Sequence, residues 1–367
     1  MKRFIYIILV ITLVACKKEQ KKFDADEIII STETSNENLL MSEYIDTSYF
    51  IQLETNDNSL IKMTGKIVFD SQRIFIYDLF GQGNNKLLVF DRNGKFLNTI
   101  GNFGNGPGEY AELRDFCIDS ANRQIFLLCE SGIVRCYDYA GRFKEKYTAE
   151  SDLKTYKIEC LDEHFYFIGG EKDFFNLVIT DSKFKITQKF FPNKDFGENM
   201  VILVHPLNVV RSHIQYRRDM DNYIYLIKDH KDAIKQYAID FGENTIDFSE
   251  LKNLSQDALR EKIKTTRGDI YSFIQNSGHA VFYYSDKKEV AIGIYDKKSR
   301  ITKNYSIKNM VDKYLGNHPL FFEYVTASNE FVAVINPAEL QEISTDYVKG
   351  MQVLEDDNPI LYVVKMK

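Results

Sequence analysis

The sequence contains no tryptophan and only six prolines in 367 residues. It also lacks the charge imbalance that marks nucleic-acid-binding proteins, since 47 basic residues face 53 acidic ones and the formal net charge is -6. Acidic and basic residues are interspersed, and no basic block occurs. Nucleic acid is therefore not expected as a partner. No apolar run reaches the roughly 20 residues that a membrane-spanning helix needs.

Recognisable catalytic and metal-binding motifs are missing as well. The six histidines are scattered without metal-ligand spacing, and no Gly-x-Ser-x-Gly nucleophile elbow occurs. We therefore assign no catalytic residue and expect no metal and no cofactor. Four cysteines lie beyond the N-terminal region, at spacings that match no zinc pattern: Cys117, Cys129, Cys136 and Cys160. In an oxidising compartment two of them can form a disulfide, and buried free thiols explain them equally well, so both states stay open.

The N-terminus carries an export signal. A short basic start, Met1-Lys2-Arg3, precedes an apolar run from Phe4 to Val14, which is the composition of a secretory signal peptide. Leu13-Val14-Ala15-Cys16 resembles the lipobox of bacterial lipoproteins, in which the cysteine is acylated and becomes the new N-terminus. The alternative is an ordinary cleaved signal with a chance cysteine. We expect a signal peptide over residues 1–15, a lipid on Cys16 that attaches the protein to a membrane, a flexible tether over residues 16–42, and a folded domain over residues 43–367.

Short runs of β-branched and aromatic residues recur along the folded part. The runs are Ile74–Tyr77, Ile125–Leu128, Phe165–Ile168, Tyr223–Leu226, Val281–Tyr284 and Phe331–Val334. Aligned on their second positions, they step by roughly 40 to 60 residues, which is the period of a propeller blade. The pattern predicts an all-β fold, a six-bladed β-propeller of four-stranded antiparallel blades with short helical inserts.

Turn sequences support this interpretation in the first two units. Asp91 and Gly94 in one unit correspond to Asp138 and Gly141 in the next, and each pair separates two strand-like segments. The aspartates are expected to cap the turns and the glycines to adopt positive φ. Weaker echoes occur at residues 178–184, 236–242 and 294–300. The repeat is faint in units three and four, so their boundaries stay open.

Both ends of the folded part look like strands, Tyr49–Glu54 and Pro359–Lys365. If they share one blade, the ring closes without a free sheet edge. Two helical inserts are expected, one from Ser249 to Lys264 and one that begins at Pro337 after Asn336 as N-cap. Rim decoration is the simpler role for both, and a lid or a partner site is the alternative.

The most conspicuous loop joins the first two units. It contains four glycines: Gly101, Gly104, Gly106 and Gly108. A dinucleotide-binding role fails, because Glu109 stands where a third glycine of the fingerprint is needed and the loop leads into a strand rather than a helix. We therefore interpret the glycines as structural, fixing a tight path from one blade to the next.

The same loop carries a family resemblance. Gly104-Asn105-Gly106-Pro107-Gly108-Glu109-Tyr110, followed by Asp115-Phe116-Cys117-Ile118-Asp119, resembles the signature of the Bacteroidales-type six-bladed β-propeller lipoproteins. The segments Phe50–Thr55 and Asn358–Ile360 are similar to the same family, and the similarity covers nearly all of the mature chain. These proteins are related in form to NHL-type propellers. The resemblance implies an outer-membrane lipoprotein, facing the periplasm or the cell surface, with a generally unassigned role and no established catalytic residues.

Propellers place ligands at the mouth of the central channel, where the first strands and the loops before them converge. In the second unit these positions give four candidate ligand-binding residues: Glu109, Tyr110, Arg114 and Asp115. The structural alternative is that Glu109 caps the glycine loop and that Arg114 and Asp115 form a solvated pair. 

Two functions from different classes remain. The first is a non-enzymatic binding or scaffold module of the cell envelope, a monomer whose partner is an envelope protein or a glycan. The second is a carbohydrate-active enzyme, a glycoside hydrolase or lyase, in which Glu109 or Asp115 supplies one of two carboxylates at the channel mouth.

Overall fold

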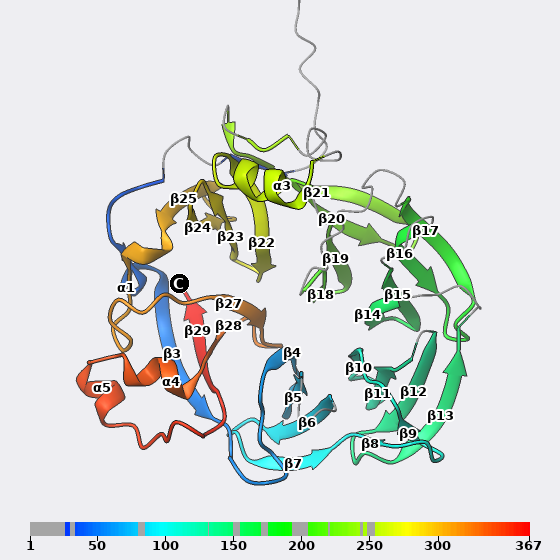
Figure 1. Ribbon diagram of the computed structural model, residues 1–367. Helices are drawn as coiled ribbons and strands as arrows, with labels where there is room; N and C mark the ends of the chain where they lie inside the picture. Colours follow the sequence, from blue (N-terminus) through cyan, green and yellow to red (C-terminus); the bar gives the residue numbers. More distant parts are fainter. Residues whose placement is uncertain are drawn as a thin grey trace, which may run out of the picture.

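The computed structural model is a ring of six antiparallel sheets around a central channel (Figure 1). The structure describes residues 26–29, 34–79, 85–130, 132–149, 155–169, 175–192, 205–218, 221–242, 245–247 and 254–367. The predicted six-bladed propeller is confirmed. The signal peptide and Cys16 lie outside the described residues. Among the residues that the structure describes, no helix has the length and apolarity needed to span a membrane.

The first three blades follow one another along the chain. Blade one consists of β4 (Thr64–Phe69), β5 (Arg73–Asp78), β6 (Lys86–Asp91) and β7 (Phe96–Thr99). Blade two consists of β10 (Asp115–Asp119), β11 (Gln124–Leu128), β12 (Ile133–Asp138) and β13 (Phe143–Thr148). Blade three consists of β14 (Thr155–Leu161), β15 (His164–Gly169), β16 (Phe175–Thr180) and β17 (Ile186–Pro192). In each blade the first strand lines the channel and the fourth lies at the outer rim (Figure 1).

The remaining blades complete the ring. Blade four consists of β18 (Leu207–Val210), β19 (His213–Arg217), β20 (Tyr223–Lys228) and β21 (Asp232–Asp240). Blade five consists of β22 (Arg267–Gln275), β23 (His279–Asp286), β24 (Glu289–Asp296) and β25 (Ile301–Ser306). Blade six consists of β27 (Phe322–Val325), β28 (Phe331–Ile335), β29 (Ile360–Met366) and β3 (Ile45–Gln52).

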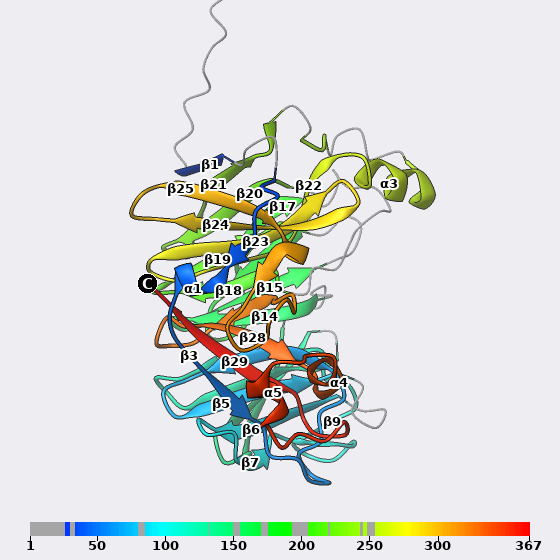
Figure 2. The same ribbon diagram turned by 90° about the vertical axis from the view of Figure 1, so that its left-hand side faces the viewer.

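Blade six closes the ring as the sequence predicts. Its outer strand β3 comes from the N-terminal side of the chain and pairs antiparallel with β29, from Gln52 opposite Ile360 to Ile45 opposite Met366. The blue and red strands lie side by side in both views (Figures 1 and 2). The contact joins segments more than 300 residues apart, so both ends of the folded part must be in place before the last blade is complete.

The hydrophobic core lies between blades rather than within one of them. Six buried clusters each join two neighbouring blades. Along β5, Ile74 and Ile76 pack toward blade six, whereas Phe75 and Tyr77 pack toward blade two. A strand buried on both faces needs an unbroken apolar run, which is why the repeats are visible in the sequence as such runs.

The predicted turn chemistry is also confirmed. The Asp91 carboxylate accepts hydrogen bonds from the amides of residues 93 and 95, and Gly94 has a φ of +87°. Asp138 accepts in the same way from residues 140 and 142, with Gly141 at +81°. In blade three Asp181 repeats the arrangement, but Phe184 takes the glycine position at a φ of +62° and buries its ring.

The alignment of the six apolar runs is wrong in blade four. Five of the runs lie in the second strands of their blades, whereas Tyr223–Leu226 lies in β20, a third strand. The second strand of that blade is β19, which contains the buried polar residues Gln215 and Arg217. These two residues interrupt the apolar run that marks a second strand elsewhere, so the sequence alignment slips by one strand. The echo assigned to residues 236–242 falls in and after β21 for the same reason.

The segment before β3 follows the outside of the ring. β1 (Asp26–Ile29) adds a parallel fifth strand to blade four beside β21. Ser35 then donates its amide to Asn304 of blade five at 3.0 Å. β2 (Leu39–Leu40) pairs with β26 (Met310–Val311), which follows the 3-10 turn Ile307–Asn309, and α1 (Met41–Tyr44) leads into β3. Part of the segment predicted as tether therefore packs along blades four and five.

Both predicted helical inserts contain helix. α3 (Gln256–Ile263) falls within the first, and α4 (Pro337–Gln341) begins the second with the expected capping box between Asn336 and Glu339. The second insert breaks after α4 and resumes as α5 (Asp346–Lys349), capped by Thr345. All three helices lie toward one side of the ring (Figure 2).

A candidate binding site in the channel

A cavity of about 760 Å³ occupies the channel and is lined by all six blades. Its walls are the ends of the channel-lining strands and the turns that lead to the second strands, such as residues 118–122, 161–165, 207–211 and 324–327. Exposed turn residues, among them Asn122 and Glu163, border it. We call this side of the ring the turn face, and the opposite side, with the glycine loop at residues 100–114 and the helical inserts, the loop face.

A buried ion cluster borders the cavity through two lining residues, Lys66 and Glu159. Lys66 of β4 reaches the neighbouring blades, and its Nζ lies 3.1 Å from Glu159 Oε2 and 3.7 Å from Asp115 Oδ2. The same ammonium donates to the carbonyl oxygens of Phe116 at 2.6 Å and Ile158 at 3.1 Å. These three side chains have relative exposures of 12% for Lys66, 1% for Asp115 and 9% for Glu159. The cluster therefore joins the channel-lining strands of blades one, two and three.

The ionisation of the cluster follows from competing effects. Burial works to lower the pKa of Lys66, but the carboxylates of Asp115 and Glu159 outweigh it and hold that pKa above its usual value. Burial raises the pKa of the Glu159 carboxyl above its usual range, although Lys66 opposes the shift. Asp115 Oδ1 is buried without a hydrogen-bond partner among the described residues, so this cluster is not fully satisfied.

His205 borders the same cavity from the segment before β18. Its ring packs edge-on against Tyr324 of β27, with centroids 5.0 Å apart. Burial, together with the positive charges of Lys157, Lys66 and Arg217, lowers the pKa of His205 to about 3. The imidazole is therefore neutral at physiological pH and presents one donor and one acceptor nitrogen.

Neutral polar groups and aromatic rings share the rest of the lining. Side-chain amides come from Asn122, Asn208 and Gln275, and rings from Phe126 and Tyr324. The Asn208 amide nitrogen is buried and has no hydrogen-bond partner within the part of the chain that the structure describes. A buried donor without a partner costs about 1–3 kcal/mol, which an acceptor on a bound ligand can recover.

The glycine loop is held by contacts within the protein. Glu109 Oε2 accepts the Gly106 amide at 2.8 Å, and β8 (Asn102–Phe103) pairs with β9 (Glu109–Tyr110) across the loop. Gly101, Gly104 and Gly108 have positive φ. At Gly108, with a φ of +75°, an added Cβ would lie 2.6 Å from Phe143 Cβ, so no larger residue fits without a shift. Tyr110 is buried, and its hydroxyl donates to the Asn85 carbonyl at 3.3 Å.

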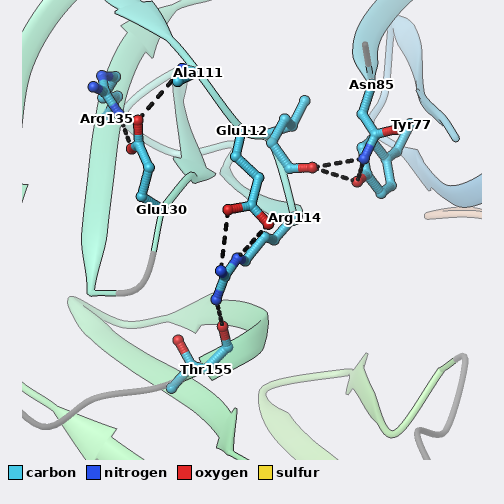
Figure 3. Close-up of polar contacts among 9 residues, drawn as sticks. Tyr77, Asn85, Ala111, Glu112, Arg114, Glu130, Arg135 and Thr155 are labelled. Carbon is cyan, nitrogen blue, oxygen red and sulfur yellow. Dashed lines mark hydrogen bonds and ion pairs between the residues drawn. The ribbon is translucent and has the colours of Figure 1, made fainter. Parts of the chain in front are cut away.

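Arg114 and Asp115 do not form the solvated pair considered as an alternative. Arg114 forms a two-bond ion pair with Glu112, at 2.9 and 3.0 Å, and donates to the Thr155 carbonyl of blade three at 3.1 Å (Figure 3). Asp115 is buried and accepts the Ile158 amide at 2.9 Å. Both residues therefore link blade two to blade three.

Nearby contacts on the loop face are of the same structural kind. Glu130 bonds to Arg135 and to the Ala111 amide, and Asn85 bonds to the Tyr77 hydroxyl (Figure 3).

The four candidates from the sequence come from one loop and the strand that follows it, and none belongs to the cavity lining. Their role in ligand binding stays a prediction. The sequence reasoning missed Lys66, Glu159 and His205, which the ring brings to the cavity from three different blades.

The cysteines are free thiols in the structure, and all four are buried: Cys117, Cys129, Cys136 and Cys160. Two of them are neighbours, because Cys117 lies on β10 and Cys160 on the adjacent β14. Their sulfur atoms and a carboxylate oxygen of Glu159 lie within 4.8 Å of one another. Among the described residues, Cys117, Glu159 and Cys160 form the group of potential metal ligands whose ligand atoms lie close together.

Comparison with known proteins agrees with the fold. The family model described as a domain of unknown function (DUF4934) matches residues 26–365. The crystal structure of a "putative exported protein" from Bacteroides fragilis superposes with a TM-score of 0.78 at 22% identity, covering 93% of this chain and 99% of that one. These two findings confirm the resemblance to Bacteroidales-type six-bladed propellers of unassigned role.

Two other solved structures superpose less closely. The U3-55K structure has a TM-score of 0.47 at 11% identity, covering 86% of this chain and 98% of that one. The WD40 repeats of RRP9 have a TM-score of 0.47 at 10% identity, covering 87% and 97%. No curated protein matches the sequence.

Proposed function

We propose that this chain, which belongs to the DUF4934 family, is a binding module held at the bacterial cell envelope by a lipid on Cys16. The observation that carries the binding role is the cavity of about 760 Å³ in the channel, lined by every blade. This volume is within the range of small-molecule and sugar sites, which combine apolar walls with a few placed polar groups.

A neutral polar ligand, such as the end of a glycan, suits the lining best. The aromatic rings offer apolar faces, and the side chains of Asn122, Asn208 and His205 offer donors and acceptors. Lys66 is already neutralised by Asp115 and Glu159, so the cavity does not favour a strongly anionic ligand. We propose that the ligand enters from the turn face, since the exposed turns that border the cavity lie there.

The envelope location rests on the N-terminal sequence. The signal peptide and lipobox motif support export and lipid attachment, and the B. fragilis relative is described as exported. An outer-membrane address follows the family resemblance. The comparisons do not favour the alternative of a carbohydrate-active enzyme. Two of the carboxylates that line the cavity are already engaged, since Glu159 is bound by Lys66 and Asp119 is bonded to Asn122 in its own turn.

A glycan and peptide binding screen tests the proposal on the chain from Asp24 onward, which contains every described residue. Ala121 lies exposed at the cavity border, so Ala121→Trp is expected to block entry and weaken binding at least tenfold. Ala140→Trp is the matched control, because Ala140 is also exposed in another turn of blade two but is not part of the lining. Equal loss in both variants, or none in either, contradicts binding in the cavity. Release of hydrolysis products would favour the enzyme.

A further inference from the structure

The buried thiol pair suggests a second kind of site. We propose that Cys117, Cys160 and Glu159 bind a thiophilic divalent cation, with Zn²⁺ as its representative, at the inner end of the channel cavity. The three ligand atoms come from β10 and β14, the channel-lining strands of adjacent blades. They already lie within 4.8 Å of one another. This site is independent of the organic ligand proposed above.

The spacing of these atoms is close to what zinc requires. With Zn–S bonds of about 2.3 Å and tetrahedral angles, two ligating sulfurs lie about 3.8 Å apart. Side-chain rotation at Cys117 and Cys160 is what brings the two sulfurs from within 4.8 Å to this separation. The donor set of two thiolates and one carboxylate is one that zinc accepts and that magnesium and calcium do not favour.

Charge balance also favours a divalent ion here. When Zn²⁺ replaces the two thiol protons, the two charges that enter equal the two that leave, and both protons pass to solvent. The buried cluster of Lys66, Asp115 and Glu159 therefore keeps the same net charge with and without the metal. A buried site that exchanges two protons for one divalent ion adds no net charge to the interior, and the metal–ligand bonds offset the loss of the ion's hydration shell.

A second layer of contacts already orients the carboxylate ligand. Lys66 Nζ lies 3.1 Å from Glu159 Oε2, and the Cys160 amide donates to Glu159 Oε1 at 3.1 Å. Each carboxylate oxygen keeps a further lone pair for a metal. Such outer contacts fix the direction of first-layer ligands and raise metal affinity.

An entry path exists on the cavity side. Glu159 and Cys160 both line the cavity, whereas Cys117 lies behind them at 0% exposure. Three protein ligands leave a fourth coordination position for water. Sequence analysis did not indicate this site, because its cysteines lie in different repeats and match no local zinc spacing.

Cobalt binding to the full-length protein in detergent tests the proposal. Co²⁺ is a spectroscopic substitute for Zn²⁺, and a thiolate-bound cobalt gives a near-ultraviolet charge-transfer band and strong visible bands. We expect one equivalent to bind with these bands and to be displaced by Zn²⁺. Cys117→Ser and Cys160→Ser are each expected to weaken binding at least 100-fold. Cys136→Ser is the control, because Cys136 is a buried thiol of blade two outside the cluster, and it should bind cobalt as the natural chain does.

A second measurement covers the case in which a cysteine variant fails to fold. In the natural chain, Zn²⁺ should slow alkylation of Cys117 and Cys160 relative to Cys129 and Cys136, as read by peptide mass spectrometry. Absence of thiolate bands together with unchanged alkylation overturns the proposal. So does cobalt binding that survives both cluster substitutions, or a Cys117–Cys160 disulfide in the purified protein.

Discussion

Removing the charge of Lys66 is the most direct test of how the channel is held together. In Lys66→Met the side chain keeps a similar length but loses the ammonium, which leaves Asp115 and Glu159 buried beside each other. The carbonyl oxygens of Phe116 and Ile158 also lose their donor. The variant therefore removes two ion-pair contacts and two hydrogen bonds without creating a large cavity.

The expected loss follows from the burial of the partners. Breaking a buried ion pair by removing one member costs about 3–5 kcal/mol, because the remaining charge is left without compensation. An exposed pair contributes about 0–1 kcal/mol. Lys66 is 12% exposed and its partners are 1% and 9% exposed, so the higher range applies. The expected destabilisation is about 3 kcal/mol.

Urea unfolding followed by far-ultraviolet circular dichroism measures the change, in the presence of a chelator so that bound metal does not contribute. Lys308→Met is the matched control, because Lys308 pairs with Glu289 at 2.7 Å but the two side chains are 67% and 49% exposed. The control should lose less than about 1 kcal/mol. The double variant Lys66→Met with Glu159→Gln should recover part of the loss. A loss below 1 kcal/mol for Lys66→Met, or no recovery in the double variant, would refute the reasoning.

Three further changes test other parts of the fold. Gly94→Ala should lower the free energy of unfolding in urea by about 1–3 kcal/mol, because the new Cβ would lie 2.1 Å from the Gln52 carbonyl oxygen at a φ of +87°. In the control Gly278→Ala the new Cβ meets no atom closer than 3.9 Å, so the loss should be less than about 1 kcal/mol. The pKa of His205 is lowered to about 3 in the folded state, so its contribution to stability is complete above the unfolded pKa near 6.5 and is lost as the pH falls toward 3. Between pH 7 and 4.5 the unfolding free energy of the natural chain should fall by about 2 kcal/mol more than that of His205→Asn. Equal losses would contradict this prediction. Glu339→Ala, which removes the capping box of α4, should lower the unfolding free energy by about 0.5–1 kcal/mol, and a similar loss in exposed Glu342→Ala would argue against a capping effect.

The architecture could be predicted because it depends on local signals that repeat. Unbroken apolar runs mark strands that are buried on both faces, and Asp91 and Gly94 mark a turn whose geometry tolerates few other residues. Ring closure could be predicted from the apolar character of the segments that became β3 and β29. In each case the information lies within a short stretch of chain.

Blade four shows where such signals fail. In β19, Gln215 and Arg217 occupy positions that are apolar in other second strands, and both bond across to blade five. Buried polar groups of this kind are satisfied by partners more than 50 residues away. A local pattern cannot indicate that such a residue belongs to a core, so the alignment moved to the next apolar strand.

The four candidate binding residues, none of which lines the cavity, were chosen for a related reason. The glycine loop is conspicuous in the sequence because its backbone adopts conformations that favour glycine. A requirement for glycine does not indicate that the neighbouring side chains bind a ligand. Phe143 and Glu109 occupy the space that side chains at Gly108 and Gly104 would need, which explains the glycines without a ligand. The residues that line the cavity lie in ordinary strands and turns and are unremarkable when taken one at a time.

A signal for the buried cluster does exist, but it requires the repeats to be aligned first. Lys66, Phe116 and Ile158 each lie three residues before the last residue of the channel-lining strand in their blade. Equivalent positions in successive blades lie at the same height in the channel, so the Lys66 ammonium meets the backbone carbonyls of the other two residues. Ionisable or thiol residues within one or two positions of that level, such as Glu159 and Cys117, must then come together. Charged residues at matching positions of channel-lining strands are therefore a better guide to the chemistry of a propeller than its most conspicuous loops.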